Sequence, residues 1–75
     1  MELPEYIVQL SWDAEAGVWI ATSDSLPGLA MESGSLDALI ERVRFAAPDL
    51  LELNGMPGKS FSLRFHSERH EKICL

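Results

Sequence analysis

The chain has 75 residues, with twelve acidic side chains against six basic ones and a formal net charge of −6. This length leaves room for one domain, and a domain so small buries only about 60% of the surface that its unfolded chain exposes. Its core is therefore marginal unless close packing or oligomerisation supports it. The negative charge disfavours direct binding to nucleic acid, because the phosphates repel it.

Signals for export, disulfide formation and membrane insertion are missing from the sequence. Cys74 is the lone cysteine, which excludes an internal disulfide, and the N-terminus carries no basic stretch followed by an apolar run. No uninterrupted apolar stretch approaches the roughly 18 residues that a membrane span requires. We therefore expect a cytoplasmic oligomer that does not bind membranes.

The first two predicted elements form a β-hairpin. Apolar and polar residues alternate over 5–12, and this period of two is typical of a half-buried strand. Residues 17–22 are rich in β-branched and aromatic side chains, which favours a second strand. The polar loop 13–17 ends in glycine and is short enough to join the two strands as a hairpin.

The register of this hairpin decides where Trp19 lies. If Trp12 pairs with Val18 across the loop, Trp19 and Ile7 share the sheet face that no helix covers. A large aromatic beside an aliphatic residue on such a face is a candidate interface, and we expect a homodimer that buries it. In the alternative register, shifted by one residue, Trp19 enters the core. The first register also pairs Leu10 with Ile20 and Val8 with Thr22.

A turn, a short strand and a helix are predicted next. Leu26–Gly28 ends the second strand, since proline lacks the amide that a strand ladder needs and glycine adopts positive φ. Residues 29–32 follow as a third strand. Ser35 is placed to cap a helix, with Asp37 in the first turn at the positive end of the helix dipole. The helix carries an apolar stripe that should lie on the same face of the sheet as Tyr6 to Trp12; it is formed by Leu36, Leu39, Ile40 and Val43.

Pro48 interrupts the helical pattern. Proline removes a backbone amide and its ring crowds the preceding turn, at a cost of about 3 kcal/mol inside a regular helix. We therefore expect a kink or a break near Ala47, and after a break Pro48–Leu53 would form a second short helix. Asn54–Gly55 would end this region, because glycine and asparagine favour helix C-termini.

The rest of the chain is predicted to contain one strand between two irregular segments. Residues 56–59 are typical of a loop. Phe61, Leu63 and Phe65 alternate with polar residues, which favours a fourth strand. Residues 67–75 are predicted to form a flexible tail. The element order is therefore βββαβ within a single domain, residues 1–75.

The carboxylates form no recognisable catalytic set. A two-metal nuclease site needs carboxylates that project from neighbouring strands to a point where two metals lie about 3.5 to 4 Å apart. Asp13, Glu15 and Asp24 fall in loops, where turn chemistry explains them. The sequence also lacks a nucleophile elbow and a glycine-rich phosphate loop, so we expect neither enzyme activity nor a cofactor.

His66, His70 and Cys74 recur every four residues, and this spacing has two interpretations. In a helical tail, two imidazoles and a thiolate would share one face as zinc ligands. In a strand followed by a solvated end, the three side chains would not converge. We favour the second interpretation, because His66 continues the fourth strand and no fourth ligand accompanies the three.

Three segments carry a resemblance to a known family: Ser23–Leu29, Glu32–Asp37 and Ala46–Gly55. The first two resemble the opening domain of HicB-type antitoxins. All three together resemble more closely an uncharacterised HicB-like family known only as a domain of unknown function. The likeness runs from Tyr6 to Phe65.

The resemblance implies an α+β fold, namely a cut-down ribonuclease-H-like sheet with strands in the order 3-2-1-4 and the helix on one face. A right-handed crossover from the third strand to the fourth suits this arrangement. Sheet-mediated dimers are common in HicB-like families, which agrees with the homodimer expected above.

Two functions are compatible with these observations, and both are those of a non-catalytic protein-interaction domain. In the first, the chain resembles an antitoxin that inhibits a small basic ribonuclease toxin of the HicA kind. In the second, it is a free-standing binding or scaffolding domain whose ligand is unknown. HicB antitoxins usually carry a C-terminal DNA-binding segment, and the sequence reaches Leu75 without one, so we expect no operator-binding role.

Overall fold

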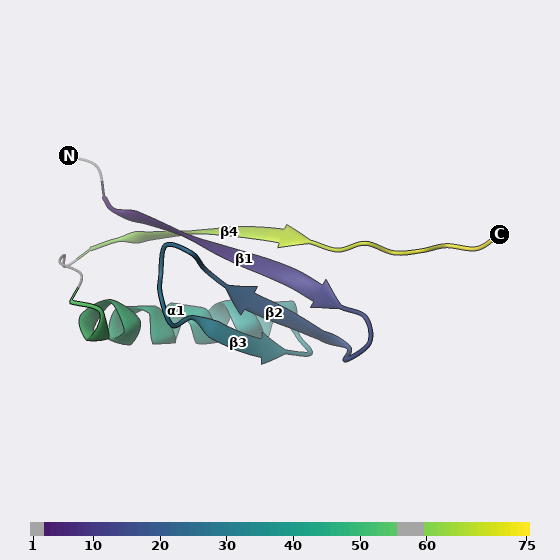
Figure 1. Cartoon of the computed structure of the whole chain (residues 1–75), viewed down its shortest axis with the longest axis horizontal. Helices are drawn as coiled ribbons and strands as arrows, with labels where there is room; N and C mark the ends of the chain where they lie inside the picture. Colours follow the sequence, from purple (N-terminus) through teal and green to yellow (C-terminus); the bar gives the residue numbers. More distant parts are fainter. Residues whose placement is uncertain (1–2, 56–59) are drawn as a thin grey trace.

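The computed structural model of the chain describes residues 3–55 and 60–75 and shows a four-stranded mixed sheet with one helix against one face (Figure 1). The strands lie in the order β3-β2-β1-β4, with β1 parallel to β4 and the other neighbours antiparallel. The predicted α+β fold and strand order are confirmed. The predicted loop at 56–59 lies outside the described residues. The elements are β1 (Glu5–Asp13), β2 (Val18–Thr22), β3 (Ala30–Ser33), α1 (Leu36–Leu53) and β4 (Ser62–Glu68).

The predicted register of the hairpin is wrong by one residue. Trp12 pairs with Trp19, and Asp13 pairs with Val18 as the last residue of the β1 ladder. The loop therefore has four residues instead of five. The Gly17 amide donates to the Asp13 carbonyl at 2.8 Å, and the Asp13 carboxylate accepts from the amides of the next turn residues, which fixes this shorter loop.

This register moves Trp19 to the side of the sheet that α1 covers. Trp19 is buried, with 9% of its surface exposed, whereas Ile7 is 39% exposed on the opposite side. The two residues do not share a face, so the predicted surface that joins them does not exist. The alternative interpretation, in which Trp19 enters the core, is confirmed.

α1 is one continuous helix through Pro48, so the predicted break and second short helix are wrong. Its N-cap is Ser35, as predicted, and the Ser35 hydroxyl accepts from the Ala38 amide at 3.3 Å. Pro48 is exposed, while Ala47 and Leu51 on either side of it are buried. Burial of both holds the two halves of the helix against the sheet and offsets the lost backbone bond. The buried stripe is Leu39, Val43, Ala47 and Leu51, with Leu36 and Ile40 packed beside it.

The Leu-Pro-Gly turn is attached to the end of α1. Gly28 has a φ of +91°, and a β-carbon at this position would lie 3.3 Å from the Leu50 side chain. The Asn54 amide group donates to the Pro27 carbonyl at 3.0 Å and to the Leu50 carbonyl at 2.8 Å. Leu26 is fully buried beneath the turn. The first and last segments of the family resemblance are therefore in contact.

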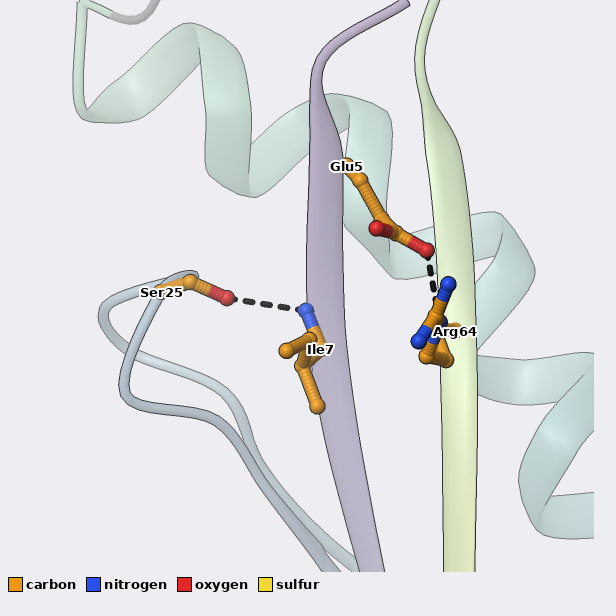
Figure 2. A network of polar contacts seen from close by, with 4 residues as sticks. All are labelled: Glu5, Ile7, Ser25 and Arg64. Atoms are coloured by element: carbon orange, nitrogen blue, oxygen red, sulfur yellow. Dashed lines mark hydrogen bonds and ion pairs between the residues drawn. The ribbon is translucent and has the colours of Figure 1, made fainter.

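Beyond the end of β2, the backbone of β1 has no described strand beside it on that side. Ser23 and Ser25 provide hydrogen-bond partners there instead. The Ile7 amide donates to the Ser25 hydroxyl at 2.9 Å (Figure 2). The Ser23 hydroxyl donates to the Ile7 carbonyl. On the other side of β1, Arg64 of β4 pairs with Glu5 at 2.7 Å (Figure 2). Serine side chains thus satisfy the Ile7 backbone groups on the side of β1 where pairing with β2 has stopped.

Candidate functional site

The helix covers only half of its face of the sheet. α1 packs on β2 and β3 and lies farther from β1 and β4 (Figure 1). Leu63 and Phe65 of β4 point to the helix side beside Tyr6 and Val8, because they pair with those residues, and both stay half-buried. An open hollow of about 340 Å³ remains between α1 and β4. We call this the apolar groove; it is lined by Phe61, Leu63, Phe65 and Arg44.

The outer edge of β4 is free, because β4 ends the sheet. The Ser62 amide points inward and donates to the Pro4 carbonyl at 2.9 Å. Backbone groups of successive strand residues alternate in direction, so the amides and carbonyls of Leu63, Phe65 and Ser67 point outward. An unpaired row of this kind beside an apolar groove is a template for a further strand.

β4 continues past the predicted end of the fourth strand, to Glu68, and the chain then runs on without regular secondary structure. We call residues 69–75 the tail. The Arg69 guanidinium lies 4.1 Å from the centre of the Trp12 ring, which itself stacks at a tilt on Trp19 with 5.5 Å between ring centroids. Beyond this contact the tail extends away from the body of the domain (Figure 1). Ile73 is 80% exposed there.

The outer side of α1 carries an exposed aromatic among carboxylates. Phe45 is 74% exposed and lies opposite the buried stripe. Glu41 and Asp49 are one turn away on either side of it, and Glu52 is two turns away, so all four share one side of the helix. We call these four residues the acidic helix face. Arg44 at its margin pairs with Glu41 at 3.2 Å.

The carboxylates considered for nuclease chemistry do not meet. Asp13 is held by the hairpin turn, Glu15 is exposed in the same turn, and Asp24 is exposed at the other end of β2. Within residues 3–55 and 60–75, no three histidine, cysteine or acidic side chains are close enough to hold a metal ion. The same residues contain no buried polar or charged side chain.

The three residues with four-residue spacing also stay apart. His66 is exposed in β4, and the His70 ring lies 2.7 Å from the Glu68 carboxylate. Cys74 is exposed in the tail. Because residues 62–68 form a strand and the tail is not helical, the one-sided arrangement that zinc would need does not occur.

Sequence reasoning missed both surfaces described above. Phe45 lies half a turn away from the predicted apolar stripe, and that position was a sufficient signal of exposure. The apolar groove had no such signal. Phe61, Leu63 and Phe65 alternate as any buried strand would, and only the lateral position of α1 leaves them open.

Comparison with known proteins places the chain in a family. The domain of unknown function DUF1902 matches residues 5–75. The chain belongs to this family. Its match includes the tail as well as the sheet and helix. No curated protein is significantly similar to the chain.

A solved structure supports the fold of this DUF1902 member. The hypothetical protein TTHA1013 from the extremely thermophilic bacterium Thermus thermophilus is 37% identical, with a TM-score of 0.72. The likeness covers 95% of this chain and 99% of the Thermus protein. Among residues 3–55 and 60–75, the charged outer side of α1 leaves no helix apolar enough to cross a membrane.

Proposed function

We propose that this domain binds a basic protein through the acidic helix face and catalyses no reaction. The observation that carries the proposal is Phe45, a large aromatic 74% exposed between the carboxylates of Glu41 and Asp49. An aromatic anchor with charges around it is the usual composition of an interface centre and its rim. Burial of the ring would stabilise a complex by roughly 1.5 to 3 kcal/mol.

The charge balance supports a basic partner. Four ion pairs in the described part of the chain engage Glu5, Glu41, Glu68 and Glu71. The seven other acidic side chains of residues 3–55 and 60–75 have no basic side chain of those residues within ion-pair distance. A surface of this kind attracts a cationic partner and raises its association rate, with strong dependence on salt.

The partner we propose is a small basic ribonuclease of the HicA kind, with this domain as its antitoxin-type inhibitor. The HicB-like resemblance of the Leu-Pro-Gly turn and the helix end supports this identification, and so does the acidic surface. A scaffolding role would instead leave the activity of any bound enzyme unchanged. Inhibition is therefore the property that separates the two functions.

Isothermal titration against the purified product of a neighbouring reading frame, if that product is small and basic, tests the proposal. We expect one-to-one binding and complete inhibition of its ribonuclease activity. Phe45→Ser should weaken binding about 10- to 100-fold. Leu3→Ser, which removes an exposed apolar side chain outside α1, is the matched control and should bind as the wild type does.

Two results would overturn the proposal. One is equal binding by wild type and Phe45→Ser. The other is metal-dependent cleavage of RNA by the domain itself that is lost when Asp13, Glu15 and Asp24 are replaced together. The second result would make the domain a nuclease.

A further inference from the structure

We infer that the tail of one chain pairs with the outer edge of β4 of a second copy, and that two copies exchange tails in a symmetric dimer. The inference uses the edge and groove of β4 and not the acidic helix face, so it does not depend on the proposed function. Its occupant is a segment of this same chain, residues 69–75.

Residues 69–75 pair with no strand in the described part of their own chain. Arg69 lies beside Trp12, so the tail leaves β4 in the direction in which the strand was running. A return to its own β4 edge would need a tight turn. Of the residue types that favour such turns, residues 66–75 contain only Ser67 and no glycine, proline, asparagine or aspartate. The exposed Ile73 and Leu75 are therefore available to another molecule.

The side chains of the tail match the groove in their alternation. Ile73 and Leu75 are separated by one residue, as are the groove residues Phe61, Leu63 and Phe65. In an antiparallel pair, residues directly opposite each other point to the same face of the sheet. An added tail strand that presents Ile73 opposite Phe61 thus covers one end of the partner's apolar groove, and Glu71 and Arg69 then lie beside Leu63 and Phe65. The same strand would form hydrogen bonds with the outward backbone groups of β4.

The charge of this region permits the approach of two copies. Residues 62–75 contain three basic and two acidic side chains, whereas residues 1–61 contain three basic and ten acidic ones. Most of the surface of a second copy is repelled by the net charge of −6, but this edge is not. The stretch of sequence without excess negative charge is thus also the one with an open groove and unpaired backbone groups.

Like charges and the position of the apolar groove together select one register. With Ile73 opposite Phe61 of the second copy, the Ser67 residues of the two copies lie opposite each other at the symmetry axis. Glu68 of each copy then lies opposite His66 of the other. A shift of the tail by two residues that brings Ile73 opposite Leu63 would place Glu68 opposite Glu68 and Lys72 opposite Arg64, which is destabilising. The opposite shift would move Ile73 past Phe61 and place Glu71 opposite Phe61, so the groove would lose its apolar partner. We therefore expect the first register, in which Cys74 lies opposite Ser60 of the second copy.

Sedimentation equilibrium of the full chain tests the dimer. Wild type should dimerise at micromolar concentration, and Ile73→Ser with Leu75→Ser should raise the dissociation constant at least about tenfold. Circular dichroism should show an unchanged fold, because both side chains are exposed. Leu53→Ser, which removes an equally exposed residue from the end of α1, should dimerise like the wild type. A monomeric wild type, or equal weakening by Leu53→Ser, would refute the inference.

Disulfide trapping tests the register and keeps the two proposals separate. Ser60→Cys should oxidise to a covalent dimer through a bond between the introduced thiol of one copy and Cys74 of the other, identified by peptide mass spectrometry. Ala30→Cys on the β3 edge should not form a bond to Cys74. Trapping through position 30 in preference to position 60 would contradict the inference. Phe45→Ser should leave trapping unchanged, since the acidic helix face lies elsewhere.

Discussion

The two halves of the sheet are covered by the rest of the chain to different degrees. On the β2 and β3 side, α1 lies directly on the strands, and the Arg42 guanidinium donates to the Glu32 carbonyl of β3 at 3.0 Å. On the β4 side, no part of the described chain covers Leu63 and Phe65 completely, and the outer backbone groups have no strand beside them. The same sheet therefore has a closed half that maintains the fold and an open half that is available for binding.

This difference arises from the place where α1 crosses the sheet. The helix buries its stripe against β2 and β3 and is joined to the Leu-Pro-Gly turn by Asn54, so its position is fixed at both ends. A single helix about 10 to 12 Å wide cannot cover four strands that are each about 4.8 Å apart. A fold with one helix leaves one flank open for geometric reasons, and binding surfaces are expected on that flank.

The largest expected effect is a difference between leucines in the two halves. Leu39→Ala in the closed half should lower the free energy of unfolding by about 2 to 5 kcal/mol, because Leu39 is fully buried. Leu63→Ala in the open half should cost only about 1 kcal/mol, because Leu63 already contacts solvent. Urea denaturation at one fixed protein concentration measures both. Equal losses would show that the halves are equally packed.

The contact between the turn and the helix end should have an intermediate effect. Gly28→Ala places a side chain at a φ of +91° and 3.3 Å from Leu50, so we expect a loss of about 2 to 3 kcal/mol. Gly17→Ala has a similar φ of +66° but open space around it, and should cost about 1 kcal/mol. The difference between the two variants, from thermal unfolding, isolates the packing on α1. Equal losses in the two variants would mean that the Leu50 side chain moves aside without a loss of stability.

The smallest expected effect concerns the contact that directs the tail. Arg69→Ala removes the guanidinium from the Trp12 ring and should lower stability by about 0.5 to 1 kcal/mol. Arg69→Lys should recover part of the loss, since an ammonium keeps the attraction to the ring. Denaturation followed by tryptophan fluorescence measures both. A loss of the same size in Lys72→Ala, which removes a tail charge without an ion pair to the described residues, would attribute the effect to general charge instead.

Sequence patterns predicted the fold where one local signal decided each element. Ser35 at the helix start and the alternation of Tyr6, Val8 and Leu10 each had one physical explanation, and both were correct. The hairpin register failed because Asp13 serves both as the last ladder residue and as the acceptor of its turn, and its polarity suggested only the turn. Pro48 failed because burial on both sides of it outweighs a local preference.

The candidate surfaces were less predictable than the fold. Phe45 could be placed on the outside of α1 from its position relative to the predicted stripe. The apolar groove depends on how far α1 lies from β4, a tertiary distance without a pattern in the sequence. Trp19 shows the consequence of the register error, because a shift of one residue moved it from a predicted interface to the core.

Residue-resolved amide exchange at two protein concentrations tests the open half most directly. At high concentration, the outward amides of Leu63, Phe65 and Ser67 should become protected, because the tail of a second copy bonds to this edge. The amides of β3 should exchange at the same rate at both concentrations. Unchanged exchange in β4, or new protection that appears along β3 instead, would contradict the account.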